Sequence, residues 1–161
     1  MNRSLLLKPI LALLAIALFA GAELPTAAEE DLLPVDSQWK GTLTQRAKTP
    51  DNIFFPPEFD ATLTIVKREG NDFEAELREH TEGLDITFLV RGKLLRGADK
   101  SYSIDFKSYD VKALPNAAIY YLNVPYTARI SEGGLKGTWS YEQKDSGVAL
   151  AGEFKLKRAD D

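Results

Sequence analysis

The stretch Leu84–Leu94, LDITFLVRGKL, alternates between apolar and polar side chains. Its apolar face carries Leu84, Ile86, Phe88, Val90, Gly92 and Leu94, and its polar face carries Asp85, Thr87, Arg91 and Lys93. A period of two residues is typical of a β-strand that is buried on one side only. The stretch therefore predicts a strand whose apolar face packs against a core.

The same alternation extends in both directions along the chain. Short turns with Gly, Asn or Asp join most of the alternating segments, as at Glu69–Asp72 and Asp145–Gly147. Short links make consecutive strands antiparallel. The sequence predicts an all-β domain over residues 37–158, a single antiparallel meander of about eight strands. The segments are 38–46, 59–68, 73–80, 84–94, 102–107, 120–130, 135–142 and 148–157.

A small residue recurs in the middle of the apolar faces, in the pattern apolar-x-small-x-apolar. The glycines in this pattern are Gly41, Gly92, Gly137 and Gly152. Glycine weakens a flat strand, so its use indicates sharp curvature or close approach across a narrow interior. Eight strands closed on themselves leave an interior just wide enough for side chains or one small ligand. We therefore expect an up-and-down β-barrel, with a β-sandwich as the alternative.

Alternation alone does not say which face points inward. An outer-membrane barrel turns its apolar face to lipid and its polar face to the lumen. The polar face here carries many Lys, Arg, Asp and Glu side chains, which a narrow lumen could hold only with near-complete ion pairing. We expect an apolar interior that buries Trp39 and Trp139, a charged exterior, and no stable membrane insertion.

The meander, Trp39 near its start and the repeated glycine motif resemble the calycin group, which includes the lipocalins. The lipocalin start motif, Gly-x-Trp, corresponds here to Ser37-Gln38-Trp39, in which Ser replaces Gly. Arg158 corresponds to the late Arg that packs on this Trp in lipocalins. The chain is also similar to small exported lipocalin-like bacterial domains. The resemblance implies the barrel fold, and it implies no particular ligand and no catalytic residue.

The N-terminus indicates export. Residues 1–22 combine two basic residues, an apolar run and small residues at the end, which is the layout of a secretory signal peptide. Cleavage is expected after Ala22 or after Ala28. Residues 23–36 are acidic and lack periodicity, and are predicted to form a flexible leader. The predicted location is periplasmic or extracellular.

Composition excludes several classes of function. The chain has no Cys and carries a net charge of −4. Its stability therefore rests on burial without disulfides, and nucleic acid is an unfavourable partner because phosphate binding needs clustered basic residues. With one His and no Cys, a zinc site is not expected. The sequence predicts no cofactor.

Catalytic groups are also not expected. His80 lies on the polar face of its segment, and no Gly-x-Ser-x-Gly motif occurs. A paired acid–base site needs carboxylates that point into a pocket. The alternation places the carboxylates of Asp60, Asp85, Asp105, Glu74 and Glu76 on the polar face, while Asp110 sits at a strand end beside Tyr109.

Aromatic residues supply the candidate ligand-binding positions. The loop 47–58 carries Phe54 and Phe55, which could form a lid or fold back and plug the barrel end. Alternation places Tyr120 and Tyr126 inside and Tyr121 outside, in a long segment bent at Pro125. The alternative is that these are ordinary core aromatics. The candidates are Phe54, Phe55, Tyr109, Tyr120, Tyr121 and Tyr126.

We therefore expect an exported, non-catalytic β-barrel that binds a small, mostly apolar ligand. The alternative is a structural module of the cell envelope, or one that binds an envelope protein. An enzyme or an outer-membrane barrel ranks below both.

Overall fold

A computed structural model describes residues 32–48, 57–113 and 120–159, which form nine strands. None of these residues forms a helix, so none lies in a helix long and apolar enough to cross a membrane. The predicted signal peptide and the leader up to residue 31 lie outside the described residues. The strands are β1 (Gln38–Thr44), β2 (Arg46–Lys48), β3 (Glu58–Glu69), β4 (Asp72–Thr81), β5 (Leu84–Arg96), β6 (Tyr102–Ala113), β7 (Pro125–Ser131), β8 (Gly134–Gln143) and β9 (Val148–Arg158).

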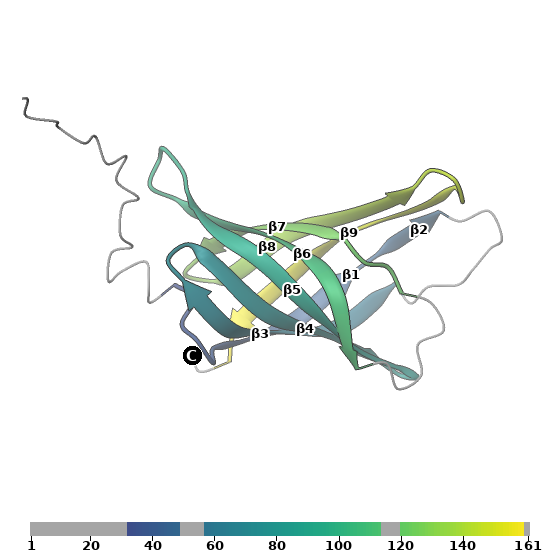
Figure 1. Ribbon diagram of the computed structural model, residues 1–161, viewed down its shortest axis with the longest axis horizontal. Helices are drawn as coiled ribbons and strands as arrows, with labels where there is room; N and C mark the ends of the chain where they lie inside the picture. Colours follow the sequence, from purple (N-terminus) through teal and green to yellow (C-terminus); the bar gives the residue numbers. More distant parts are fainter. Residues whose placement is uncertain (1–31, 49–56, 114–119, 160–161) are drawn as a thin grey trace, which may run out of the picture.

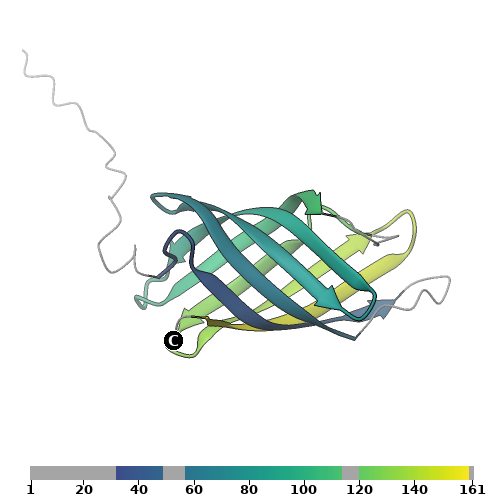
Figure 2. The same ribbon diagram turned by 90° about the horizontal axis from the view of Figure 1, so that it is seen from below.

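The strands form one closed antiparallel barrel (Figures 1 and 2). Strands β3 to β9 pair with their neighbours in sequence, and β1 closes the ring by pairing with both β3 and β9. The short β2 continues the line of β1 along β9, where Ala47 lies opposite Leu150. The predicted all-β meander and its closure into an eight-stranded barrel are confirmed, and the sandwich alternative is wrong.

The apolar faces of the strands point into the barrel. Leu63, Ile65, Val90, Ile104 and Leu135 are fully buried there. The two tryptophans are also buried, with Trp39 at 5% and Trp139 at 7% exposure. Charged residues alternate onto the outer face, where they form exposed ion pairs. The predicted apolar interior and charged exterior are therefore confirmed.

The mid-strand glycines allow close contact between neighbouring strands. A Cβ atom on Gly152 would collide with the carbonyl oxygen of Thr44 and would lie 2.6 Å from the indole nitrogen of Trp139. A Cβ on Gly41 would likewise collide with the carbonyl oxygen of Lys155. The close approach is between paired neighbouring strands, whereas the sequence pattern predicted sharp curvature or close approach across the interior.

One end of the barrel, here called the base, is covered by residues 32–37. Leu33 is fully buried against the core, and the backbone N–H of Asp36 donates a 2.8 Å hydrogen bond to the carbonyl of Ile65. Figure 2 shows this turn at the same end of the barrel as the C-terminus. Residues 32–36 fall in the segment that we predicted to be a flexible leader, so the folded domain reaches further towards the N-terminus than residue 37.

Ser37, which the resemblance aligned with the lipocalin glycine, links two residues of the base by hydrogen bonds. Its hydroxyl donates to the carbonyl of Pro34 at 2.6 Å and accepts a hydrogen bond from the indole N–H of Trp39 at 3.3 Å. Arg158 lies directly opposite Trp39 on the neighbouring strand. This placement is compatible with the calycin-like arrangement that the sequence resembles.

The opposite end, here called the mouth, is where β1 ends, β7 begins and the β4–β5 and β8–β9 turns lie (Figure 1). The prediction of one long strand over 120–130 is wrong, because β7 begins only at Pro125. Asn123 adopts a positive φ of 61°, which breaks the extended chain. The buried Ser108 holds this bend, because its carbonyl accepts from Asn123 N–H at 2.8 Å and its hydroxyl from Val124 N–H at 3.2 Å.

Candidate functional site

A cavity of about 90 Å³ opens at the mouth of the barrel. It is larger than a single water molecule needs but much smaller than a typical drug-sized pocket. Six aromatic side chains contribute to its wall, together with the polar residues Gln45 and Glu79. The aromatic residues are Phe59, Phe88, Tyr120, Tyr121, Tyr126 and Trp139.

Glu79 is the carboxylate in this wall. It belongs to the inward face of β4, in phase with the buried Phe73, Ala75 and Leu77. Its partners on the adjacent strands are Ala61 of β3 and Ile86 of β5, both buried and apolar. Burial raises the pKa of the Glu79 carboxyl from 4.5 to about 7, and the Tyr126 hydroxyl opposes that shift only in part.

Tyr126 lies next to Glu79 and links the cavity to the core below. Its hydroxyl donates a long 3.4 Å hydrogen bond to Oε1 of Glu79. Its ring stacks on Phe106 with centroids 4.8 Å apart, and contacts Trp139 and Phe154 at 6.2 and 6.1 Å. Burial, and secondarily the Glu79 charge, holds the pKa of the Tyr126 hydroxyl well above its usual value. Aromatic rings therefore fill the barrel beneath the cavity.

Gln45 adds an unsatisfied donor to the same wall. It continues the inward face of β1 after Trp39, Gly41 and Leu43, at the break between β1 and β2. Its side-chain nitrogen, Nε2, is buried and has no hydrogen-bond partner among the described atoms. A buried donor without a partner raises the free energy of the folded state, and a ligand that supplies an acceptor removes this penalty.

The predicted tyrosines all contribute to the mouth except one. Tyr126 points inward, as predicted. The predicted orientations of Tyr120 and Tyr121 are reversed, because residues 120–124 are not a strand: Tyr120 is 43% exposed, whereas Tyr121 packs on the core and contacts the Tyr141 ring at 4.6 Å. Both nevertheless border the cavity.

Tyr109 lies elsewhere. It stands at a bulge of β6 on the outer surface, where the guanidinium of Arg91 sits 4.2 Å from the centre of its ring. Asp110 beside it is exposed and accepts a hydrogen bond from the next backbone N–H. The structure therefore separates Tyr109 from the cavity. Phe54 and Phe55 lie outside the described residues.

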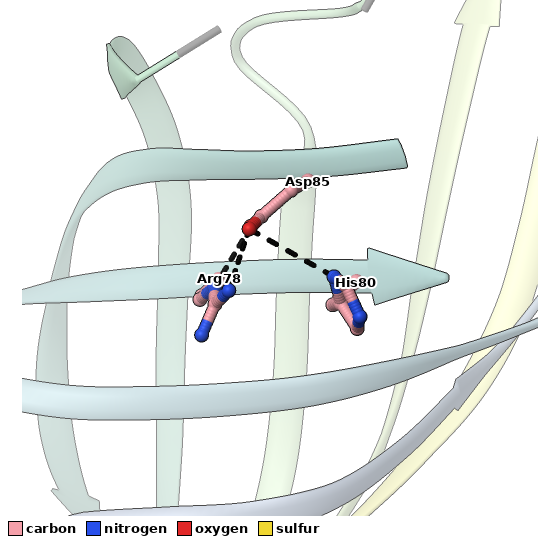
Figure 3. Close-up of polar contacts among 3 residues, drawn as sticks. All are labelled: Arg78, His80 and Asp85. Carbon is pink, nitrogen blue, oxygen red and sulfur yellow. Dashed lines mark hydrogen bonds and ion pairs between the residues drawn. The ribbon is translucent and has the colours of Figure 1, made fainter. Parts of the chain in front are cut away.

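His80 lies on the outer face with Arg78 and Asp85 (Figure 3). Arg78 Nε donates to Asp85 at 2.8 Å, and His80 Nδ1 is 3.8 Å from the same carboxylate. The hydrogen bond from Arg78 is the main cause that lowers the pKa of Asp85. All three side chains are partly or largely exposed, so the cluster is a solvated ion pair on the opposite side of β4 from Glu79.

Sequence reasoning missed Glu79 and Gln45, although a signal for both is present. Each is a polar residue that ends a series of inward-facing apolar residues. The carboxylates that we placed on the polar face do not include Glu79, which alternates onto the other face.

A larger hollow of about 860 Å³ lies over β7, β8 and β9 beside Thr127, Thr138 and Ser140. It shares Gln45 and Trp139 with the mouth cavity, and the hydroxyls of Thr127, Thr138 and Ser140 that border it are exposed to water. Over residues 32–48, 57–113 and 120–159, no group of three or more His, Asp or Glu is arranged to hold a metal ion.

No protein-family model matches the chain, and no curated protein matches it either. The barrel geometry and the mouth cavity are therefore the basis for a functional proposal.

Proposed function

We propose that this protein is a non-catalytic barrel that binds a small, mostly apolar ligand at its mouth. The observation that carries the proposal is the aromatic-walled cavity, in which Glu79 and Gln45 offer polar contacts to one end of a ligand. Concave, mostly apolar sites with a few placed polar groups are typical of small-molecule binding. Glu79 is the lone carboxylate among the described lining residues, which supports binding rather than paired acid–base chemistry.

The size of the cavity limits the ligand. A volume of about 90 Å³ exceeds what one water molecule needs but is far below that of a drug-sized pocket. The aromatic rings beneath Tyr126 leave the rest of the interior filled. The cavity therefore suits one end of a small molecule, with the remainder at the mouth.

Export forms part of the proposal. The signal-like pattern of residues 1–22 supports delivery to the periplasm or the extracellular space. N-terminal sequencing of the exported protein should begin at Glu23 or Glu29. A protein from that fraction that still begins at Met1 contradicts export with cleavage.

The binding proposal can be tested with dimethylbutanol, a small uncharged alcohol with a tert-butyl group. The two indole N–H resonances serve as reporters in an NMR titration of the isotope-labelled protein. We expect Trp139, which borders the cavity, to shift on binding, and Trp39, at the base, to stay unchanged.

A pair of variants provides the control. Leu84→Trp adds bulk to the cavity wall and should abolish the shift, whereas Val66→Trp makes the same change at an outward position that is 42% exposed and should preserve it. Absence of any Trp139 shift in the wild-type protein, or an equal response in both variants, contradicts the proposal.

A further inference from the structure

The wall of the mouth cavity carries one acid and no base. Its only charged lining residue among those described is Glu79. The strands on either side place Ala61 and Ile86 next to it, so neither adjacent strand brings a Lys or Arg alongside. Within the described residues, the contact that Glu79 makes is the long hydrogen bond from Tyr126. A carboxyl group in an apolar wall without a cation lacks the partner that would stabilise its ionised form.

The rest of the wall favours a cation as well. The negative faces of aromatic rings attract organic cations, and rings that surround a cavity form the kind of cage that binds alkylammonium groups. Tyr126, Trp139 and Tyr121 line the cavity together with Glu79. An anionic head group would instead meet the Glu79 carboxylate with nothing of opposite charge beside it.

Gln45 adds a second requirement. Its buried Nε2 donor needs an acceptor, which an alkylammonium group does not offer. A hydroxyl or ester oxygen close to the ammonium group would meet this need.

We propose that the ligand head group is an organic ammonium cation with a neighbouring oxygen, as in choline. This inference rests on the proposed function, because it names the chemistry of the ligand held at the same mouth. The ammonium group lies against Glu79 and the aromatic rings, and the oxygen accepts from Gln45. A free amino alcohol and the head group of a choline lipid share this chemistry.

The direct test compares choline with dimethylbutanol, its carbon isostere, which has the same shape without the charge. We expect choline to bind on the order of tenfold more tightly at pH 8, as followed by the Trp139 indole resonance. Equal affinities overturn the inference but leave the proposed function standing. Failure of both probes overturns the inference and the proposed function together.

Glu79→Gln is the variant that separates charge from shape. It should remove the preference for choline over dimethylbutanol, and a cooperative melting transition followed by circular dichroism checks that the variant is folded. Glu58→Gln changes an exposed glutamate at the start of β3, outside the cavity wall, and should keep the preference. A preference that survives in Glu79→Gln contradicts the role of this carboxylate.

The pH dependence gives a second readout. The neighbours of Glu79 on the adjacent strands are Ala61 and Ile86, which do not titrate. The only other titratable groups among the described lining residues are the hydroxyls of Tyr120, Tyr121 and Tyr126. Loss of the Glu79 charge below about pH 7 should therefore weaken choline binding several-fold between pH 8 and pH 6. Dimethylbutanol binding should not change over this range, and a choline affinity that is flat with pH contradicts the inference.

Vesicles distinguish the two sources of the head group. Co-sedimentation with phosphatidylcholine vesicles but not with phosphatidylglycerol vesicles supports a lipid source, and binding of free choline alone supports a soluble one. Binding to neither choline nor phosphatidylcholine overturns the inference.

Discussion

The two ends of the barrel differ in the residues with which the inward faces of the strands end. At the base, the chain itself covers the core: Leu33 is fully buried, and Ser37 hydrogen-bonds both Pro34 and Trp39. At the mouth, the inward faces of β1 and β4 end in Gln45 and Glu79, which border a cavity. At the base, Ser37 and Trp39 hydrogen-bond each other, whereas at the mouth the buried Gln45 donor has no partner among the described atoms and the Glu79 carboxyl has a raised pKa.

This difference indicates where stability and where binding are located. Satisfied polar groups and dense packing stabilise a fold. Buried polar groups without good partners lower the stability of the fold. They are retained where a ligand supplies the missing partner. The base is therefore the structural end, and the mouth is the end at which we propose binding.

The largest effect is expected from the two tryptophans. Trp39→Ala should lower the free energy of unfolding by about 3–5 kcal/mol, because a large side chain leaves a packed site. Trp139→Ala should lower it by a similar amount, because both indoles are buried and each borders a hollow. Urea unfolding of both variants measures the two losses. A loss well below this range for either variant would contradict the burial of that indole in the core.

Leu33 tests whether the turn at residues 32–37 belongs to the folded domain. Leu33→Ala should cost about 2–3 kcal/mol, because the side chain is fully buried but its short segment can partly collapse onto the core. Val35→Ala, in the same turn but 48% exposed, is the control and should have little effect. Equal urea midpoints for both variants and the wild type would show that the turn adds nothing to the base.

The pH dependence of stability tests whether Glu79 is buried at the mouth. Its carboxyl has a pKa of about 7 in the folded protein and about 4.5 when unfolded, so the folded state holds the proton over a range in which the unfolded state has lost it. The free energy of unfolding should therefore fall as pH rises from about 5 to about 7, then level off. Glu79→Gln should remove this fall. At pH 8 the variant should be more stable than the wild type by about 1–3 kcal/mol, which lies below the full value of the pKa shift because the Glu79 side chain is only partly buried.

Glu58→Gln, at an exposed position, serves as the control for that experiment and should keep the wild-type pH profile. Thermal unfolding in buffers between pH 5 and pH 8 provides the profiles. A Glu79→Gln profile that still falls between pH 5 and pH 7 would assign the effect to another group.

The smallest effect is expected on the outer face. Arg78→Ala removes the hydrogen-bonded ion pair between Arg78 and Asp85. The side chains of both residues are exposed. Exposed pairs contribute little because water and salt screen them. The melting temperature should stay within the error of the measurement, and dimethylbutanol should still shift Trp139. A loss of binding in this variant would move the site from the mouth to the outer face.

The barrel could be predicted from the sequence because burial on one side of a strand leaves a strict alternation. The mid-strand glycines favoured a closed barrel over a sandwich. Two regions could not be predicted in this way. Residues 32–36 are short, acidic and aperiodic, and only the structure shows Leu33 in the core. Residues 120–124 alternate by coincidence, and the positive φ of Asn123 leaves no such pattern.

The candidate site was predicted only in part. Tyr120, Tyr121 and Tyr126 were expected to bind, and all three border the cavity. Glu79 was missed because the carboxylates were considered as members of polar faces, although its phase in β4 matches Phe73, Ala75 and Leu77. The contact between Glu79 and Tyr126 joins β4 to β7, which are not neighbours in the sheet, and such a contact depends on closure of the barrel.

The pairing of β1 with β9 has a consequence for folding kinetics. These strands are the first and the last of the barrel, so the ring cannot close until the whole domain is available. Hairpins such as β3–β4 and β8–β9 can form locally and early, whereas the seam closes a loop that contains nearly the entire domain. Until then β1 and β9 present unpaired edges to other chains. We therefore expect closure of this seam to be the slow step of folding, and the stage at which aggregation competes with it.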